Sequence, residues 1–292
     1  LVMKWENAEK LYLNFKYNET FYRTNAPIVP ESISADGTKA SFTVTIPTEI
    51  PEGATFDLYG VYQKESTWDE NNGGYFEKGE NNNVYICENR EEECITLDKM
   101  GSTQTGIARP VLTFKQTGIT ASTIAPIALE HRGWMMALHF KNISGAEINL
   151  PEYINFEYAT EPAASFIYNG FIGRQEVKID FDNGTISNTN SYEGTMRCVW
   201  FATEKYSWLP LYGQKLGAGE TVVLYRWLIS TSDIAKMHAL IFYPGAATYT
   251  TISPDGKFLP AKTVENGKIY HTYMTWDGTH LKITDRNGTP MP

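Results

Sequence analysis

The stretch "HRGWMMALHFKNISG", residues 131–145, indicates the fold class of this chain. Alternate positions carry large apolar side chains on one face, and His139 and Lys141 lie on the other, more polar face. A period of two is typical of a half-buried β-strand. His131 precedes His139 by eight positions, roughly 26 Å along an extended strand, which is too far for one metal ion. The stretch is therefore predicted to be a strand whose apolar face joins the core, and not a metal or cofactor site.

The same alternation recurs along most of the chain. It predicts strands over residues 10–17, 39–47, 55–63, 108–116, 133–142, 148–158, 176–181, 196–203, 220–230, 238–244, 267–276 and 279–284. An Asp-Gly pair within "TWDGTH" (275–280) is a strong signal for a tight hairpin. Many short strands joined by such turns favour antiparallel sandwiches or barrels over βαβ units.

A break in the pattern near residue 160 predicts two domains. The segment "YATEPAASFIYNG" (158–170) is rich in small residues and contains a Pro between two clusters of strands. Each half is long enough for a β-sandwich of its own. We therefore expect an N-terminal sandwich over residues 1–160 and a C-terminal sandwich over residues 161–292.

Composition excludes some classes of partner. The net charge is −9, from 25 Lys and Arg against 34 Asp and Glu, and this balance disfavours nucleic acid. The sequence contains no apolar run near the roughly 20 residues that a membrane-spanning helix needs. Its 18 Tyr, 7 Trp and 14 Phe favour β structure and an exported surface protein.

Motifs for catalysis are absent from the sequence. It has no Gly-x-Ser-x-Gly, no His-Glu-x-x-His and no phosphate-binding Gly-rich loop. Asp180, Asp182 and Asn183 precede Gly184 as in a calcium loop, but the distal Glu is missing, so a solvated turn is favoured. Paired carboxylates for glycoside hydrolysis meet only in the fold and cannot be recognised here. We predict no enzyme, no catalytic residue, no metal and no cofactor.

Two cysteines are candidates for a disulfide. Cys87 and Cys94 flank "ENREEE", which indicates strand, polar loop and strand, so that the two residues face each other at the mouth of a hairpin. In an oxidising compartment a bond is expected, and two reduced thiols are the alternative. Cys198 lies among strand-forming apolar residues and is predicted to be a buried free thiol.

Residues 64–83, "KESTWDENNGGYFEKGENNN", form the least regular segment and carry three aromatic residues. Trp68, Tyr75 and Phe76 could offer flat apolar surfaces on which sugar rings stack. The alternative is that these aromatic side chains fold back and cap the sandwich. The first interpretation predicts a surface glycan-binding lipoprotein.

Three segments resemble the fimbrillin family, the surface lipoproteins and type V pilus subunits of Bacteroidales. They are "LEHRGWMMALHFKNISGAEINLPEYINFEY" (129–158), "VENGKIYHTYMTWDGTHLKIT" (264–284) and "GGYFEKGENNNVYI" (73–86). The resemblance implies two tandem transthyretin-like antiparallel β-sandwich domains. It also implies export, a lipid anchor upstream of residue 1, and display at the outer membrane and cell surface as a pilus subunit or its tip or anchor component.

The resemblance further implies assembly by donor-strand exchange with other pilus subunits. In the family an N-terminal strand is removed by proteolysis after a basic residue, and a strand of the next subunit fills the groove. Here "KLYLNFKY" (10–17) would be the displaced strand and Arg23 the cleavage point, in a segment expected to be exposed. Alternatively, Arg23 is an ordinary surface residue and the strand stays in place. A host or bacterial surface ligand is a further expected partner.

Overall fold

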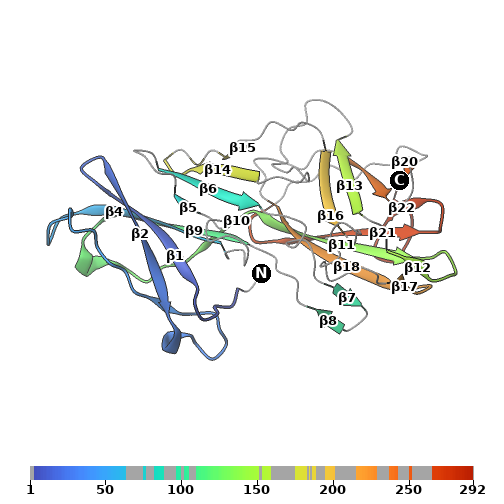
Figure 1. The fold of residues 1–292 in the computed structure, drawn as a ribbon, viewed down its shortest axis with the longest axis horizontal. Helices are drawn as coiled ribbons and strands as arrows, with labels where there is room; N and C mark the ends of the chain where they lie inside the picture. The colour runs from blue at the N-terminus through green and yellow to red at the C-terminus, as the bar shows by residue number, and fades with distance from the viewer. Residues whose placement is uncertain are drawn as a thin grey trace. The chain divides into compact units, whose positions relative to one another are not determined.

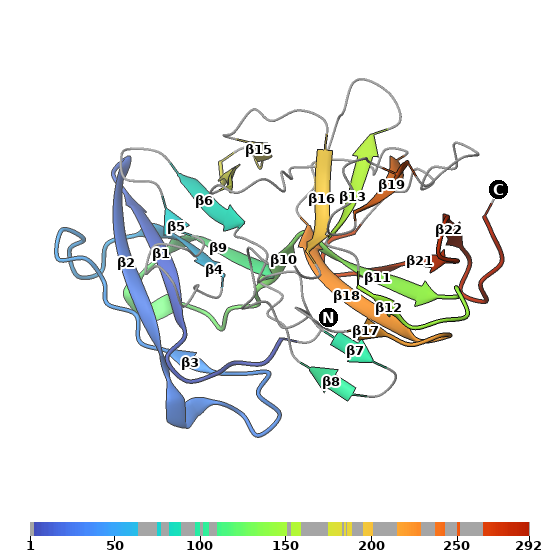
Figure 2. The same cartoon turned by 45° about the vertical axis from the view of Figure 1, so that its right-hand side comes forward.

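The computed structural model describes a chain built of β-strands (Figures 1 and 2). The described residues are 3–63, 75–76, 82–88, 97–99, 102–104, 110–150, 153–158, 175–182, 184, 186–188, 195–200, 215–228, 237–242, 250–251 and 265–291. Their helical elements are two short 3-10 turns, η1 (Pro30–Ser32) and η3 (Ala121–Thr123). Within these residues no helix is long and apolar enough to cross a membrane. The predicted all-β class is confirmed.

The chain forms two compact units that interleave along the sequence. Unit 1 consists of 1–88, 110–132 and 176–189, and unit 2 consists of 89–109, 133–175 and 190–292. Both units use residues on either side of position 160, because strands from both halves of the chain pair within each unit. A single cut at residue 160, as expected from the sequence, does not follow these contacts. The transthyretin-like arrangement stays a prediction.

Unit 1 contains a six-stranded sheet in the order β10-β9-β4-β1-β2-β3. Its strands are β1 (Lys10–Tyr17), β2 (Thr20–Val29), β3 (Ser41–Phe42), β4 (Phe56–Tyr62), β9 (Val111–Ile119) and β10 (Glu130–Arg132). All neighbours pair antiparallel. A four-stranded sheet has the order β15-β14-β6-β5. It is formed by β5 (Tyr75–Phe76), β6 (Asn83–Glu88), β14 (Gln175–Asp180) and β15 (Ile186–Asn188).

Unit 2 contains a four-stranded sheet in the order β18-β11-β21-β22. Its strands are β11 (Trp134–Asn142), β18 (Thr221–Leu228), β21 (Ile269–Trp276) and β22 (Leu281–Thr284). β11 pairs antiparallel with β18 but parallel with β21, which departs from the antiparallel pattern expected (Figures 1 and 2). Parallel neighbours need a long connection, and more than a hundred residues separate these two strands.

The remaining described strands of unit 2 form a second four-stranded sheet and two strand pairs. The sheet has the order β16-β13-β19-β20, and the pairs are β12-β17 and β7-β8. Their bounds are β7 (Leu97–Lys99), β8 (Ser102–Gln104), β12 (Ile148–Asn149), β13 (Tyr153–Tyr158), β16 (Thr195–Trp200), β17 (Lys215–Leu216), β19 (Met237–Phe242) and β20 (Thr250–Thr251).

β11 has the two faces that its sequence predicts. Trp134, Leu138 and Phe140 are buried on one face, with Phe140 0% exposed. His139 is partly exposed on the other face. That second face is not wholly polar, because Ala137 is also buried there. The apolar stripe therefore belongs to the core, as the alternation indicated.

The core of unit 1 is built around β1. Leu11, Leu13 and Phe15 point to one side of this strand and are fully buried. They pack with side chains from β2, β4 and β9, namely Ala26, Phe56, Leu58, Tyr62, Leu112 and Phe114, and with Ile50. Alternation in "KLYLNFKY" thus places three large apolar groups in one layer, and their burial stabilises the sheet.

Gly60 provides space for an aromatic ring in this core. It pairs with Phe114 across β4 and β9, and a Cβ at position 60 would overlap the ring carbons of Phe114. We expect Gly60→Ala to lower the free energy of unfolding by about 1–3 kcal/mol, because the ring must leave its place. Urea denaturation measures this. Combining Gly60→Ala with Phe114→Leu should recover part of the loss, and an unchanged midpoint for Gly60→Ala alone would contradict the packing.

Candidate functional site

The N-terminal hairpin contains Arg23, the predicted cleavage point, and it also contains β1, which supplies side chains to the core of unit 1. β1 and β2 are joined by Asn18 and Glu19, which both have positive φ, 49° and 60°. Two such residues are typical of the tight turn that matches the twist of a hairpin. The strands then pair without interruption from Tyr17 with Thr20 to Lys10 with Pro27.

Arg23 lies in the middle of β2, opposite Asn14 of β1. It is partly buried and belongs to a hydrogen-bonded ladder, while Asn25 and Pro27, which follow it, are exposed. Cleavage after Arg23 stays a prediction. A protease needs an extended, accessible backbone, so the hairpin has to open before the bond after Arg23 can be cut.

We therefore expect the bond between Arg23 and Thr24 to resist trypsin in the folded protein. The bond after Arg286 is the internal control, because Arg286 lies in an exposed turn. A time course followed by mass spectrometry should show cleavage after Arg286 well before cleavage after Arg23. In urea both bonds should be cut at similar rates. Equal rates under native conditions would show that β2 does not protect the bond.

The segment before β1 is anchored to the same core. The ring of Trp5 lies edge-on to Phe42 and Tyr62, with centroids 5.0 Å and 4.9 Å away. The hydroxyl of Tyr62 donates a hydrogen bond to Glu9. Burial, with this hydrogen bond and the charge of Glu9, raises the pKa of Tyr62 above its ordinary value. The hydroxyl therefore stays protonated and continues to donate.

On its other face β1 is held by a chain of hydrogen bonds that runs from a buried amide to a second amide and on to a carboxylate. Asn14 is 0% exposed, and its Nδ2 donates to Oδ1 of Asn82 at 3.1 Å. Asn82 in turn donates from Nδ2 to Oδ1 of Asp182 at 3.1 Å. The chain connects three segments that are distant in sequence. A polar network of this kind specifies which strands meet.

Tyr59 lies on the same face of the sheet as Asn14. Burial first, and then the charges of Asp57 and Asp182, raise the pKa of Tyr59 to about 12. Its ring packs edge-on against Phe181, with centroids 5.7 Å apart. Tyr59 therefore stays neutral at physiological pH and serves packing.

The three aromatic candidates for glycan binding are not brought together by the described structure. Phe76 lies in β5 and is 5% exposed, with its ring 5.6 Å from that of Phe181. A buried ring cannot stack on a sugar, so Phe76 packs inward, as the alternative interpretation had it. Tyr75 pairs with Tyr85, but its side chain and the whole of Trp68 lie outside the described residues.

The disulfide stays a prediction. Cys87 lies in β6, and Cys94 lies outside the described residues. Cys198 lies in β16, as expected for a strand residue, and its side chain is not among those described.

The acidic segment after β14 forms a turn. Asp180 Oδ1 accepts the backbone N–H of Asp182 at 2.8 Å, and the carbonyl of Asp180 accepts the N–H of Gly184 at 2.8 Å. Asp182 also accepts from Asn82, so its carboxylate belongs to that chain of hydrogen bonds. Over the part of the chain that is described, no three His, Cys, Asp or Glu side chains gather as a metal would require.

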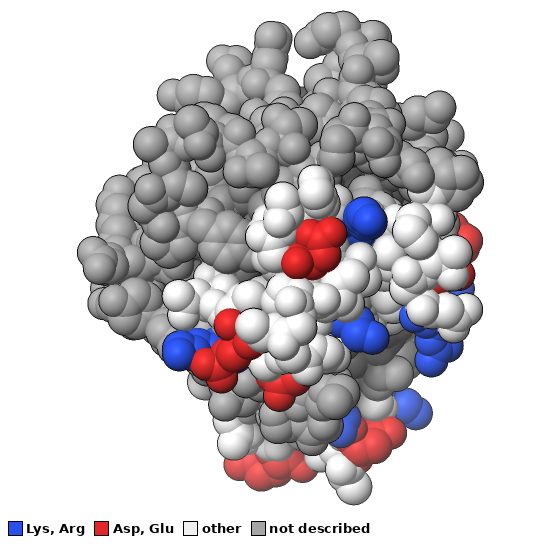
Figure 3. Space-filling model, turned by 90° about the vertical axis from the view of Figure 1, so that its right-hand side faces the viewer, with Lys and Arg blue, Asp and Glu red and all other residues white. Residues whose placement is uncertain are grey.

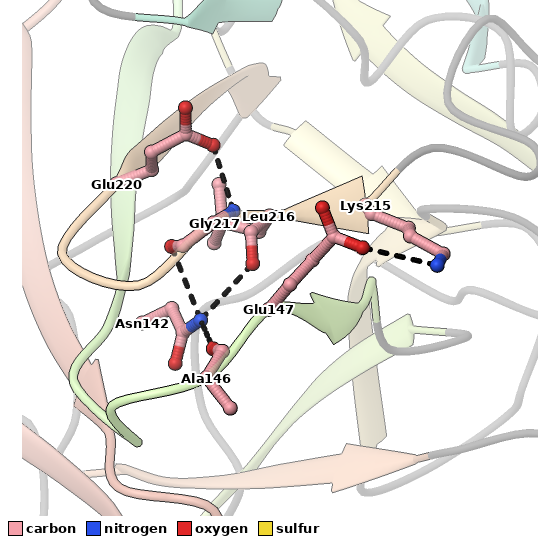
Figure 4. Close-up of polar contacts among 7 residues, drawn as sticks. All are labelled: Asn142, Ala146, Glu147, Lys215, Leu216, Gly217 and Glu220. Carbon is pink, nitrogen blue, oxygen red and sulfur yellow. Dashed lines mark hydrogen bonds and ion pairs between the residues drawn. The ribbon is translucent and has the colours of Figure 1, made fainter.

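Asn142, at the end of β11, organises the turn that follows this strand (Figure 4). Its side chain is 0% exposed. Nδ2 donates to three backbone carbonyls, those of Ala146 at 2.7 Å, Leu216 at 3.0 Å and Gly217 at 3.1 Å. Oδ1 accepts from the N–H of Ser144 at 3.0 Å and from its hydroxyl at 2.7 Å. One amide thus joins the ends of β11, β12 and β17.

Neighbouring polar contacts support the same turn. Glu220 accepts the N–H of Gly217 at 2.7 Å, and Lys215 forms an exposed ion pair with Glu147 at 3.0 Å (Figure 4). Asn142 lies in the segment 129–158 that resembles the fimbrillin family, but the resemblance did not indicate its role. The available signal was an Asn at a strand end, followed by Ser144 and by Gly145, whose φ is 81°.

Charges of both signs are mixed on the face drawn in Figure 3. Lys and Arg side chains alternate with Asp and Glu side chains over the described part of that face. A mixed surface of this kind gives no focused field that would steer a polyanion.

Comparison with known proteins gives structural neighbours alone. No protein-family model and no curated protein match the chain. A candidate cell adhesion protein of Bacteroides uniformis has a TM-score of 0.46 and 10% identity, covering 97% of this chain and 92% of its own. A candidate cell adhesion protein of Bacteroides fragilis gives 0.43 and 12%, covering 99% and 88%. A candidate adhesin of Bacteroides thetaiotaomicron gives 0.40 and 9%, covering 96% and 89%. Scores below 0.5 leave the function to be argued from the residues of this chain.

Proposed function

We propose that this chain is a non-enzymatic adhesion protein of the cell surface, a pilus subunit or its tip or anchor component, which assembles by exchange of an N-terminal strand. The observation that carries the proposal is the place of β1. The first strand of the chain occupies the interior of a six-stranded sheet and supplies Leu11, Leu13 and Phe15 to the core. The proposal includes export and a lipid anchor upstream of residue 1, on the strength of the sequence resemblance.

Removal of β1 would create a groove that another strand can fill. β1 pairs with β2 from Lys10 to Tyr17 and with β4 from Tyr12 to Lys16, so its loss exposes two unpaired backbone edges. It also opens the apolar layer beneath Leu13 and Phe15. A strand with the same alternation restores both the hydrogen bonds and the burial, which is the physical basis of β-augmentation.

Release of β1 does not depend on Arg23. The turn at Asn18 and Glu19 is exposed, and a cut there would separate β1 while leaving β2 whole. Cleavage after Arg23 would instead divide β2 and remove the half of that strand that pairs with Asn14 to Tyr17. The turn is therefore the better-placed site for a protease that acts on the folded protein.

Strand replacement tests the proposal directly. A specific protease site inserted between Asn18 and Glu19 of the full chain allows β1 to be nicked in the folded protein. A fluorescent peptide of residues 8–18 should then enter the nicked chain, seen as a rise in anisotropy, and should not enter the intact chain. The matched control peptide carries Leu13→Asp and Phe15→Asp and should not bind. Equal binding of both peptides, or none by the nicked chain, would overturn strand exchange.

The glycan-binding alternative now rests on Trp68 and Tyr75 alone. Phe76, the third aromatic candidate, is buried against Phe181. A glycan array with the full chain separates the two functions, because strand exchange predicts no dependence of binding on Trp68. Specific sugar binding that Trp68→Ala abolishes would favour the alternative.

A further inference from the structure

We propose that His139 and His271 bind one late first-row divalent metal ion, with Cu²⁺ preferred, on the face of the β18-β11-β21-β22 sheet opposite Phe140. The sequence argument considered His131 and His139, which are too far apart along the chain. The fold brings a different histidine to His139, through the parallel pairing of β11 with β21.

The two imidazole rings already face each other. Nε2 of His139 lies 2.8 Å from Nδ1 of His271, and the ring centroids are 5.1 Å apart. In the metal-free protein this distance is a hydrogen bond, with one ring as the donor and the other as the acceptor, as the tautomers decide. The two nitrogens that a metal would use are thus held together by the backbone pairing of their strands.

The two imidazole ligands favour one class of metal. The 2.8 Å between Nε2 of His139 and Nδ1 of His271 is set by their hydrogen bond, which a metal ion would replace. Metal–nitrogen bonds to imidazole measure about 2.0–2.1 Å, so a small turn of the exposed His271 ring brings both nitrogens to one ion. Cu²⁺ is preferred because it binds such nitrogen ligands more strongly than Ni²⁺ or Zn²⁺ do.

The ring of His139 is held in place by a neighbouring aromatic ring, whereas the ring of His271 can turn. Tyr273 pairs with His139 across the two strands and stacks on its ring, with centroids 4.4 Å apart and planes inclined by 26°. His271 is exposed, so its ring can turn until both lone pairs meet at one point. Lys141 is exposed two positions beyond His139 on the same face. Among the described residues no third His, Cys, Asp or Glu joins the pair, and water completes the coordination in this proposal.

Such a site would tie together two strands that are distant in sequence. His139 and His271 are 132 positions apart. An ion that binds the folded pair and not the separated histidines stabilises the folded protein by mass action, so the midpoint of thermal unfolding should rise with the concentration of the ion.

Metal titration of the full chain without an affinity tag tests the proposal. Cu²⁺, Ni²⁺ and Zn²⁺ are added separately in a buffer that does not chelate, and binding is followed by calorimetry. We expect one equivalent of Cu²⁺ to bind, with weaker binding of Ni²⁺ and Zn²⁺. Electron paramagnetic resonance of the Cu²⁺ form should show coupling to two nitrogens. The thermal midpoint should rise on Cu²⁺ addition.

Three variants decide the assignment. His139→Gln and His271→Gln should each weaken Cu²⁺ binding at least about tenfold, because each removes a ligand. His280→Gln is the matched control, since His280 lies in the turn after β21 beside Asp277, and it should bind Cu²⁺ as the parent does. Thermal unfolding without metal checks that each variant is folded. No saturable binding by the parent, or equal binding by His271→Gln, would overturn the proposal.

Discussion

Asn142→Ala is expected to lower the free energy of unfolding by about 3 kcal/mol or more. The substitution leaves three backbone carbonyls, those of Ala146, Leu216 and Gly217, without the donor that they share. It also removes the acceptor for Ser144. Because the side chain of Asn142 is fully buried, its removal leaves the carbonyl of Leu216 without a donor in the interior. Urea denaturation followed by Trp fluorescence gives the change.

Two further substitutions show whether the loss of stability comes from the amide group of Asn142 or from any change in this part of the turn. Asn142→Asp keeps the size but turns a carboxylate toward the three carbonyls, so it should be at least as destabilising as Ala. Ile143→Ala changes an adjacent side chain that is 46% exposed, and it should shift the stability by no more than about 0.5 kcal/mol. A small effect for both Asn142 variants would mean that the ends of β11, β12 and β17 are held by other contacts.

Phe15→Ala is expected to lower the free energy of unfolding by about 4 kcal/mol, the range for a fully buried aromatic side chain. The ring is 0% exposed and lies 5.3 Å from that of Phe56, in the layer that β1 shares with β4. The measurement is the denaturation midpoint together with its slope. A lower dependence of the unfolding free energy on denaturant concentration would show that the cavity makes the native state less compact as well as less stable.

Lys16→Ala is the control for Phe15→Ala. Lys16 is the next residue on β1, and it pairs with Glu19, whose side chain is 88% exposed, at 2.9 Å. Loss of so exposed an ion pair should change the stability by less than about 1 kcal/mol. If Phe15→Ala were equally mild, β1 would contribute little to the core, and the groove left by its removal would not attract a replacement strand.

Local alternation predicted most of the longer strands, but it missed β2 and also short strands such as β8, β10 and β15. β1 spans Lys10–Tyr17, the same residues as the predicted strand, and β11 begins one residue inside its predicted bounds. β2 was missed because its apolar residues are interrupted by Arg23, Thr24 and Asn25 and because it contains Pro27. Its place in the sheet comes from pairing with β1, a contact that no pattern within β2 displays.

The sequence pattern did not predict which distant strands pair with each other. Alternation in residues 267–276 predicted a strand, but it carries no information on which neighbour that strand takes or in which direction. The parallel alignment of β11 with β21, and with it the meeting of His139 and His271, follows from the topology of the whole chain. The inward packing of Phe76 likewise depends on Phe181, about a hundred residues further on.

The parallel pair also sets the order in which unit 2 can be completed. Residues 134–142 leave the ribosome long before residues 269–276, so β11 has one neighbour position empty for most of synthesis. Closing so long a loop is slow, because its entropy is lost before the new contacts form. Until then the edge of β11 and the hydrophobic surface around Phe140 are open to aggregation. A chain of this topology therefore has an unpaired strand edge for most of its synthesis, which only its last strands cover.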